Sequence, residues 1–220
     1  MDIYEKTLDL TFELTRILSV VGSKGEIDAA IKIYELLAEL DYFKANPGNL
    51  KIKDLKGDAL GRKYVLAIVE GRPEAKDAVL TLGHIDTVGI EDYADLKPYA
   101  TDPVALKEKL AEKVFTQEVT EDLKSDNWLF GRGIFDMKTG VATLITMVEI
   151  FSKRARELSG HLIFIAVPDE EGNSAGMLSA VEDLSELANE KGWDFIAAID
   201  TDYMTGHYPS DENKYVYIGS

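Results

Sequence analysis

The chain of 220 residues contains no cysteine, which excludes disulfides and thiolate metal sites. Positive charge is scarce, with 24 Lys and Arg against 40 Asp and Glu. The formal net charge of -16 argues against nucleic acid or an anionic membrane as a partner. No apolar run is long enough to span a bilayer, and the N-terminus has no signal peptide. We therefore expect a cytoplasmic protein.

Histidine is also scarce, and one of the three histidines has a suggestive neighbour. His84 stands two residues before Asp86, behind the apolar run 78–82, which predicts a buried strand. The period of two places both side chains on one face near the strand end, where open α/β sheets bind ligands. A carboxylate beside a histidine can orient the imidazole of a metal ligand. His161 and His207 lack such a partner in the nearby sequence, and we expect them to be structural or exposed.

Hydrophobic periodicity predicts strands that alternate with helices. Strands are predicted at about 64–70, 78–82, 161–167, 195–199 and from 215, and helices at about 4–20, 23–40, 104–114, 139–151 and 177–191. The strand 161–167 is strongly apolar, which indicates burial on both faces and parallel pairing. The alternation predicts an α/β protein whose sheet is covered on both faces. Residues 90–127 are polar and irregular, which indicates an excursion over the sheet edge or the mouth of a site.

Acidic residues stand where several of these elements end. Asp136 precedes the helix that starts near 139, Glu170 and Glu171 follow one apolar strand, and Asp200 and Asp202 follow the next. Clustered acids repel one another unless a cation neutralises them. Imidazole and carboxylates without thiolates suit catalytic zinc or another first-row divalent metal. In the adjacent pair, one glutamate could bind metal and the other act as general base on a metal-bound water.

Each acid also has an ordinary structural explanation. Asp136 alone would cap the following helix, Glu170 and Glu171 would be solvated acids ahead of a helix, and Asp202 would be a loop residue. Together with His84 and Asp86, however, such residues stand at the ends of four consecutive α/β elements. This repetition favours a metal site over the separate explanations.

Three segments together resemble successive signatures of the M20 metallopeptidase family. They are Gly-His-Ile-Asp-Thr-Val at 83–88, Gly-Arg-Gly-Ile-Phe-Asp-Met-Lys-Thr-Gly at 131–140 and Asp-Glu-Glu-Gly at 169–172. The insertion at about 90–127 and the stretch 202–219 are most similar to the arginine-utilisation branch of that family. The resemblance implies an α/β, three-layer zinc-exopeptidase-like fold with a mostly parallel mixed sheet.

The resemblance also implies two divalent metal ions, zinc in the first place, with Co²⁺ or Mn²⁺ as alternatives. Carried over to this sequence, His84 binds the first ion, Asp136 bridges both ions, and Glu171 binds the second. Asp202 completes the ligand set of the first ion, and Asp200 is the less suitable candidate for that place.

The family pattern further assigns Glu170 as the general base and Asp86 as the residue that orients the imidazole of His84. Glu170 would take a proton from a metal-bound water as the water attacks an amide or peptide bond. The implied substrate is a small peptide or an N-acylated amino acid, in arginine or amino-acid catabolism.

Members of the family are longer than this chain. Residues 1–220 would be the N-terminal portion of a catalytic domain, incomplete at the C-terminus. The lid and dimerisation domain, through which a parent homodimer would form, would be absent, as would a later histidine that binds the second metal. The alternative hypothesis is a non-catalytic or inactive truncated α/β module that binds a metal or an amino-acid ligand without hydrolysis.

Overall fold

A computed structural model describes residues 2–204, 216 and 218. His207 and most of the strand expected from residue 215 lie outside the described residues. The helices are α1 (Ile3–Thr15), α2 (Gly25–Ala38), α3 (Asp41–Ala45), α4 (Pro103–Ala111), α5 (Gln117–Lys124), α6 (Thr139–Ser152) and α7 (Ala175–Lys191). The strands are β1 (Leu50–Asp54), β2 (Lys63–Val69), β3 (Asp77–His84), β4 (His161–Val167) and β5 (Asp194–Asp200). Short helical turns occur at Pro47–Asn49, Glu91–Tyr99, Ile134–Lys138 and Ala155–Glu157.

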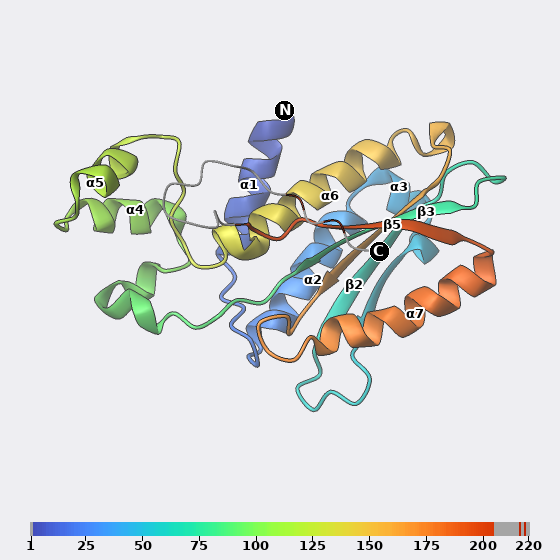
Figure 1. The fold of residues 1–220 in the computed structure, drawn as a ribbon, viewed down its shortest axis with the longest axis horizontal. Coiled ribbons are helices and arrows are strands. Elements are labelled where there is room, and N and C mark those ends of the chain that lie inside the picture. Colours follow the sequence, from blue (N-terminus) through green and yellow to red (C-terminus); the bar gives the residue numbers. More distant parts are fainter. Residues whose placement is uncertain (1, 205–215, 217, 219–220) are drawn as a thin grey trace.

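The five strands form one mixed sheet in the order β1-β2-β4-β3-β5 (Figure 1). β3 pairs in parallel with both β4 and β5, whereas β2 pairs antiparallel with both β1 and β4. The expected α/β fold with a mixed sheet is confirmed. The prediction of parallel pairing for residues 161–167 is right for only one neighbour, because β4 runs antiparallel to β2.

Helices cover both faces of the sheet and give the fold three layers (Figure 1). Alternate residues of β4 point to opposite sides. Phe164 and Ala166 join a core with α1, α2 and α6, whereas Ile163 and Ile165 join a second core with α7. Covering helices, not parallel pairing on both sides, therefore explain why the residues of β4 after His161 are all apolar. Full burial of one such side chain stabilises the fold by about 1.5–3 kcal/mol.

β5 corrects a second expectation. The run 195–199 predicts a buried strand, but β5 lies at the sheet edge, and Ile196 and Ile199 are 61% and 49% exposed. An apolar sequence indicates a strand but not its position in the sheet, because that position depends on pairing with distant residues.

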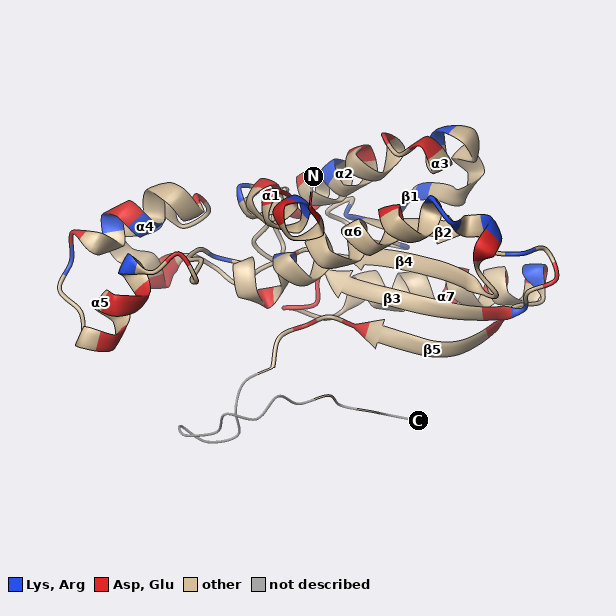
Figure 2. Cartoon of the chain, turned by 90° about the horizontal axis from the view of Figure 1, so that it is seen from above, with Lys and Arg blue, Asp and Glu red and all other residues tan. Residues whose placement is uncertain are grey.

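Residues 90–127 form a small unit beyond the sheet. Figure 2 shows α4 and α5 at the end of the molecule toward which β3, β4 and β5 point. The side chain of Asp102 accepts the N–H groups of Val104 and Ala105 at the start of α4, in agreement with the sequence, whereas α5 is not predicted by it. Leu106 and Leu123 are buried in this unit. Within the described part of the chain, no helix is both long and apolar enough to cross a membrane.

Candidate metal centre

Residues that are far apart in the sequence meet at the carboxyl ends of the parallel strands. His84 is the last residue of β3, Glu170 and Glu171 follow β4, and Asp202 follows β5. Asp136 lies in the turn Ile134–Lys138, directly before α6. Because β3 pairs with both β4 and β5, the carboxyl ends of all three strands share one edge, the position where such sheets bind ligands.

The imidazole of His84 lies among these acids. Its Nε2 is 2.8 Å from Oδ1 of Asp136, 3.8 Å from Oδ2 of Asp202 and 3.9 Å from Oε2 of Glu170. One potential ligand atom from each of His84, Asp136 and Glu171 lies within 4.8 Å of the other two. The structure therefore brings together all four residues for which the sequence predicts metal binding, although Asp202 is not part of the tightest group.

Asp86 contacts both the histidine and the glutamates. Its main-chain carbonyl lies 3.1 Å from Nδ1 of His84, closer than its own carboxylate oxygen at 3.7 Å. The carboxylate instead accepts hydrogen bonds from the N–H groups of Glu170 at 3.1 Å and Glu171 at 3.0 Å. Asp86 is fully buried. Its backbone thus orients the imidazole so that Nε2 faces the acids, while its side chain holds the turn that carries the two glutamates.

Asp136 is positioned by the turn around it. The Sδ atom of Met137 accepts the N–H of His84 at 3.1 Å, and the N–H of Lys138 donates to the carbonyl of Gly133 at 2.8 Å. Gly133 has a φ of +78°, and a Cβ there would lie 2.6 Å from Cγ2 of Thr87. The turn therefore needs glycine at this position both for its left-handed backbone and for its close approach to the strand end.

Asp202 and Asp200 have different surroundings. Asp202 extends its carboxylate toward His84, whereas Oδ1 of Asp200 accepts the N–H of Asp202 at 3.2 Å. Gly140, in the first turn of α6, allows the chain between these two acids to approach closely: a Cβ on Gly140 would lie 2.6 Å from the carbonyl oxygen of Thr201. Of the two aspartates, Asp202 therefore has the better placement for a shared ion.

The electrostatics of the site favour added positive charge. Burial raises the pKa of Glu170 and Glu171, and nearby carboxylates raise it further, although His84 opposes them. Burial alone would lower the pKa of His84, but the contacts with Asp86, Asp136 and Asp202 outweigh it and raise this pKa to about 9. An imidazole and several carboxylates without thiolate form a donor set that suits zinc or a similar divalent ion, so the residues present fit such an ion.

Sequence reasoning missed three buried charged residues near the site. Lys138 donates from Nζ to the carbonyl of Ile17 at 2.6 Å, and Arg62 pairs with Asp169, the residue directly before Glu170. Asp169 belongs to the Asp-Glu-Glu-Gly segment at 169–172, so its place in the sequence could have pointed to the site. Arg62 belongs to no such motif. Burial depends on packing between distant segments, so the sequence around Lys138 and Arg62 does not reveal it.

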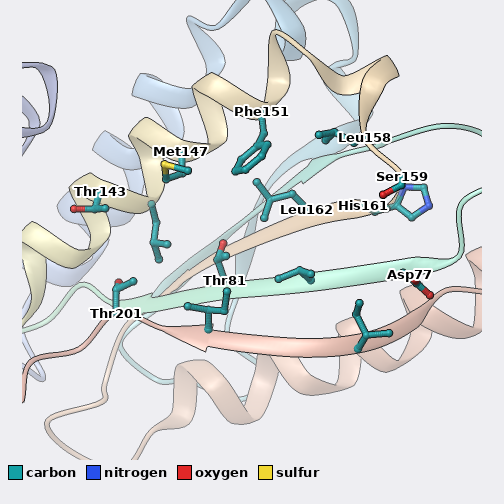
Figure 3. Close-up of a pocket in the computed structure, with 15 residues that line it drawn as sticks. Asp77, Thr81, Thr143, Met147, Phe151, Leu158, Ser159, His161, Leu162 and Thr201 are labelled. Carbon is teal, nitrogen blue, oxygen red and sulfur yellow. The ribbon is translucent and has the colours of Figure 1, made fainter. Parts of the chain in front are cut away.

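His161 is structural, as expected. It is buried, its Nδ1 accepts the N–H of Gly71 at 3.2 Å, and its ring stacks on Trp193 with centroids 3.8 Å apart. His161 also borders a groove of about 580 Å³ between α6 and the exposed edge of the sheet (Figure 3). The groove is lined mainly by apolar side chains such as Met147 and Phe151, and none of the candidate metal ligands lines it. The candidate metal site therefore lies at the strand ends and not in this groove.

The layered α/β fold and the imidazole–carboxylate cluster define a class of protein, that of α/β proteins with a candidate metal site at the strand ends. Comparison with known proteins identifies the family. A family model described as "Peptidase family M20/M25/M40" matches residues 80–212, more than half of the chain. The chain belongs to this peptidase family, as the resemblance in its motifs implies.

Three relatives illustrate the match. The chain is 37% identical over 216 residues to Protein RocB of Bacillus subtilis (strain 168), covering 98% of this chain and 38% of RocB. Human carnosine dipeptidase 1 has a similar fold, with a TM-score of 0.61 and 19% identity over 91% of this chain and 39% of that protein. Bacillus subtilis YXEP, described as a dinuclear metal-binding peptidase from the M20 family, also has a similar fold, with a TM-score of 0.51. The identity is 17%, and the match covers 90% of this chain and 42% of YXEP. The chain spans about two fifths of the length of these relatives.

Proposed function

We propose that this chain is the metal-binding N-terminal portion of a dinuclear metallohydrolase that cleaves an amide or peptide bond. The observation that carries the proposal is the convergence of His84, Asp136 and Glu171 at the carboxyl ends of the parallel strands, in a chain of the M20/M25/M40 family. Residues 90–127 are an insertion into that catalytic domain. The lid and dimerisation domain of a parent homodimer lies outside this chain.

The geometry supports a division of the ligands between two ions. Asp136 is close to both His84 and Glu171, as a bridging carboxylate must be. His84 and Asp202 would hold the first ion, and Glu171 would hold the second. Among the described residues, the first ion would then have three ligands, His84, Asp136 and Asp202, and the second would have Asp136 and Glu171. Zinc suits this donor set, with Co²⁺ and Mn²⁺ as alternatives.

Glu170 is the general base in this proposal. Divalent ions, when bound, lower the pKa of water and polarise an amide carbonyl. Glu170 is half exposed and its carboxylate lies 3.9 Å from Nε2 of His84, so it faces the cluster without being part of the tightest group. From there it takes a proton from the attacking water and delivers it to the leaving amine nitrogen.

The substrate class is a small peptide or an N-acylated amino acid. The dipeptidase among the structural neighbours supports a small peptide. The resemblance of residues 90–127 and 202–219 to the arginine-utilisation branch supports a role in arginine or amino-acid catabolism. Specificity would depend on segments outside this chain, because the metal centre alone recognises only the bond that is cleaved.

The test combines Zn²⁺ titration of this chain with hydrolysis assays of a full-length protein that contains it. We expect two unequal Zn²⁺ sites: His84→Ala removes the tighter one, Glu171→Gln the weaker one, and Asp136→Asn both. Glu170→Gln should retain Zn²⁺ but lower hydrolysis of dipeptides or N-acyl amino acids by about 100-fold or more. Two equal sites would contradict the ligand assignment. Zn²⁺ binding with hydrolysis unaffected by Glu170→Gln would favour a non-catalytic metal-binding module.

A further inference from the structure

We propose that Arg62 is a positioning residue for the metal centre, and that it acts through Asp169 to fix the turn carrying Glu170 and Glu171. This inference rests on the function proposed above, because it concerns the same site. Arg62 itself touches none of the candidate ligands that the structure groups together.

Arg62 lies directly before β2 and is 7% exposed. Its guanidinium makes hydrogen bonds in two directions. On one side Nε and Nη2 donate to Oδ1 of Asp58 at 3.1 and 2.8 Å, and on the other side Nη1 donates to Oδ1 of Asp169 at 2.5 Å. Glu26 of α2 lies 3.5 Å from the same Nη1. Arg62 therefore ties the β1–β2 loop and α2 to the end of β4.

Asp169 organises the turn that follows β4. Its Oδ2 accepts the N–H of Ala175, the first residue of α7, at 3.0 Å, and its main-chain carbonyl accepts the N–H of Ser174 at 2.6 Å. Asp169 and Ser174 have φ values of +73° and +55°, which non-glycine residues rarely adopt. Such backbone persists only where surrounding contacts enforce it, and the pairing with Arg62 is one of these contacts.

The turn is also packed tightly around the Asp169 carboxylate. A Cβ on Gly172 would lie 2.8 Å from Oδ1 of Asp169, the oxygen that accepts the bond from Arg62. Asp86 holds the same turn at a second point, through the N–H groups of Glu170 and Glu171. Two anchors thus hold the glutamates, and of the two only Asp86 contacts His84 directly.

This arrangement predicts a specific consequence for metal binding. Without the guanidinium, Asp169 is buried with no opposite charge and the left-handed turn loses a contact that enforces it. The Glu171 carboxylate then spends less time beside Asp136. Loss of such an indirect contact lowers metal affinity by about 10–100-fold.

The test measures Zn²⁺ affinity of the chain by competition with a chromogenic chelator, after circular dichroism has confirmed that each variant is folded. Arg62→Lys keeps the charge but loses the planar fork. Asp169→Asn keeps an acceptor for Ala175 but loses the charge. We expect both to weaken Zn²⁺ binding by about 10-fold or more. Asp183→Asn is the matched control, because Asp183 pairs with Lys53 and belongs to α7, which covers the opposite face of the sheet from α6. The Zn²⁺ affinity of this variant should equal that of the wild type.

A second measurement requires no metal. Amide hydrogen exchange of residues 170–175 in the metal-free chain should be faster in Arg62→Lys and Asp169→Asn than in the wild type or in Asp183→Asn. Equal affinity and equal exchange in the folded variants would overturn the positioning role. An equal loss of affinity in Asp183→Asn would also overturn it. A wild-type chain that binds no Zn²⁺ would contradict the proposed function, and the exchange rates would still decide whether Arg62 holds the turn.

Discussion

The carboxylate of Asp86 accepts the backbone N–H of Glu171 at a distance of 3.0 Å, although 85 residues separate the two in the sequence. The same carboxylate accepts the N–H of Glu170, while the main-chain carbonyl of Asp86 faces the imidazole of His84. One buried residue thus links the end of β3 to the turn after β4. Asp86 therefore fixes the position of a candidate metal ligand, His84, relative to the candidate base, Glu170.

We predict that Asp86→Asn weakens metal binding without unfolding the chain. The amide has about the same size, but its NH₂ group cannot accept a backbone N–H, so one of the two hydrogen bonds to the turn is lost. Zn²⁺ affinity should fall by about 10–100-fold, as measured by competition with a chelator. Asp77→Asn, at the exposed opposite end of the same strand, is the control and should bind as the wild type does. Unchanged affinity in Asp86→Asn would show that the turn needs no such anchor.

The close approach of α6 to the end of β5 yields a second prediction. Alanine is favoured over glycine in a helix by about 1 kcal/mol on intrinsic propensity alone. At Gly140, however, the added methyl would lie 2.6 Å from the carbonyl of Thr201, which must move and carry Asp202 with it. We expect Gly140→Ala to lower the free energy of unfolding by about 1–3 kcal/mol in urea denaturation, because overpacking outweighs propensity.

A matched substitution separates crowding from a general effect of replacing glycine. Gly48 lies in the turn Pro47–Asn49, and a Cβ there would meet nothing within 4 Å. Gly48→Ala should therefore change the free energy of unfolding by less than about 0.5 kcal/mol. Equal unfolding curves for the two variants would contradict a tight contact between Gly140 and Thr201.

Glu26 should make folding stability depend on pH. Ser23 and Glu26 have the spacing of a capping box, a serine followed three residues later by a glutamate. The N-cap residue of α2 is however Lys24, and Glu26 is fully buried beside Arg62. Burial raises the pKa of Glu26 to about 7, with Asp86 and Asp169 adding to the rise, while Arg62 and the N–H of Gly22 oppose it. The folded chain therefore holds a proton on Glu26 that the unfolded chain releases at lower pH.

The sign of the effect follows from this raised pKa. The stabilisation from protonated Glu26 is complete below the unfolded-state pKa of about 4.5 and is lost as pH rises through about 7. In Glu26→Gln this part of the dependence disappears. Between about pH 4.5 and about pH 7.5, the wild type should lose about 2–3 kcal/mol of unfolding free energy relative to Glu26→Gln. Urea denaturation in EDTA at each pH measures it, and a difference independent of pH would show that Glu26 ionises normally.

Local sequence patterns determined much of the fold and the composition of the site. The apolar runs predict β2, β3 and β4 because burial selects such residues, and Asp102 with Pro103 marks the start of α4 because both suit a helix N-terminus. The period of two along β3 places His84 and Asp86 at a strand end. The acids after the following strands indicate a cation site, since repulsion makes their clustering costly without one.

Tertiary structure decided what each element and side chain meets. The position of β5 at the sheet edge and the antiparallel pairing of β4 with β2 depend on hydrogen bonds between distant strands, which no local pattern encodes. The same holds for Arg62 and Asp169, which are 107 residues apart, and for Asp86, whose carboxylate holds the glutamate turn while its carbonyl faces His84. A sequence specifies which groups are available for burial and bonding. Packing of segments remote in the chain decides which of those groups are brought within bonding distance.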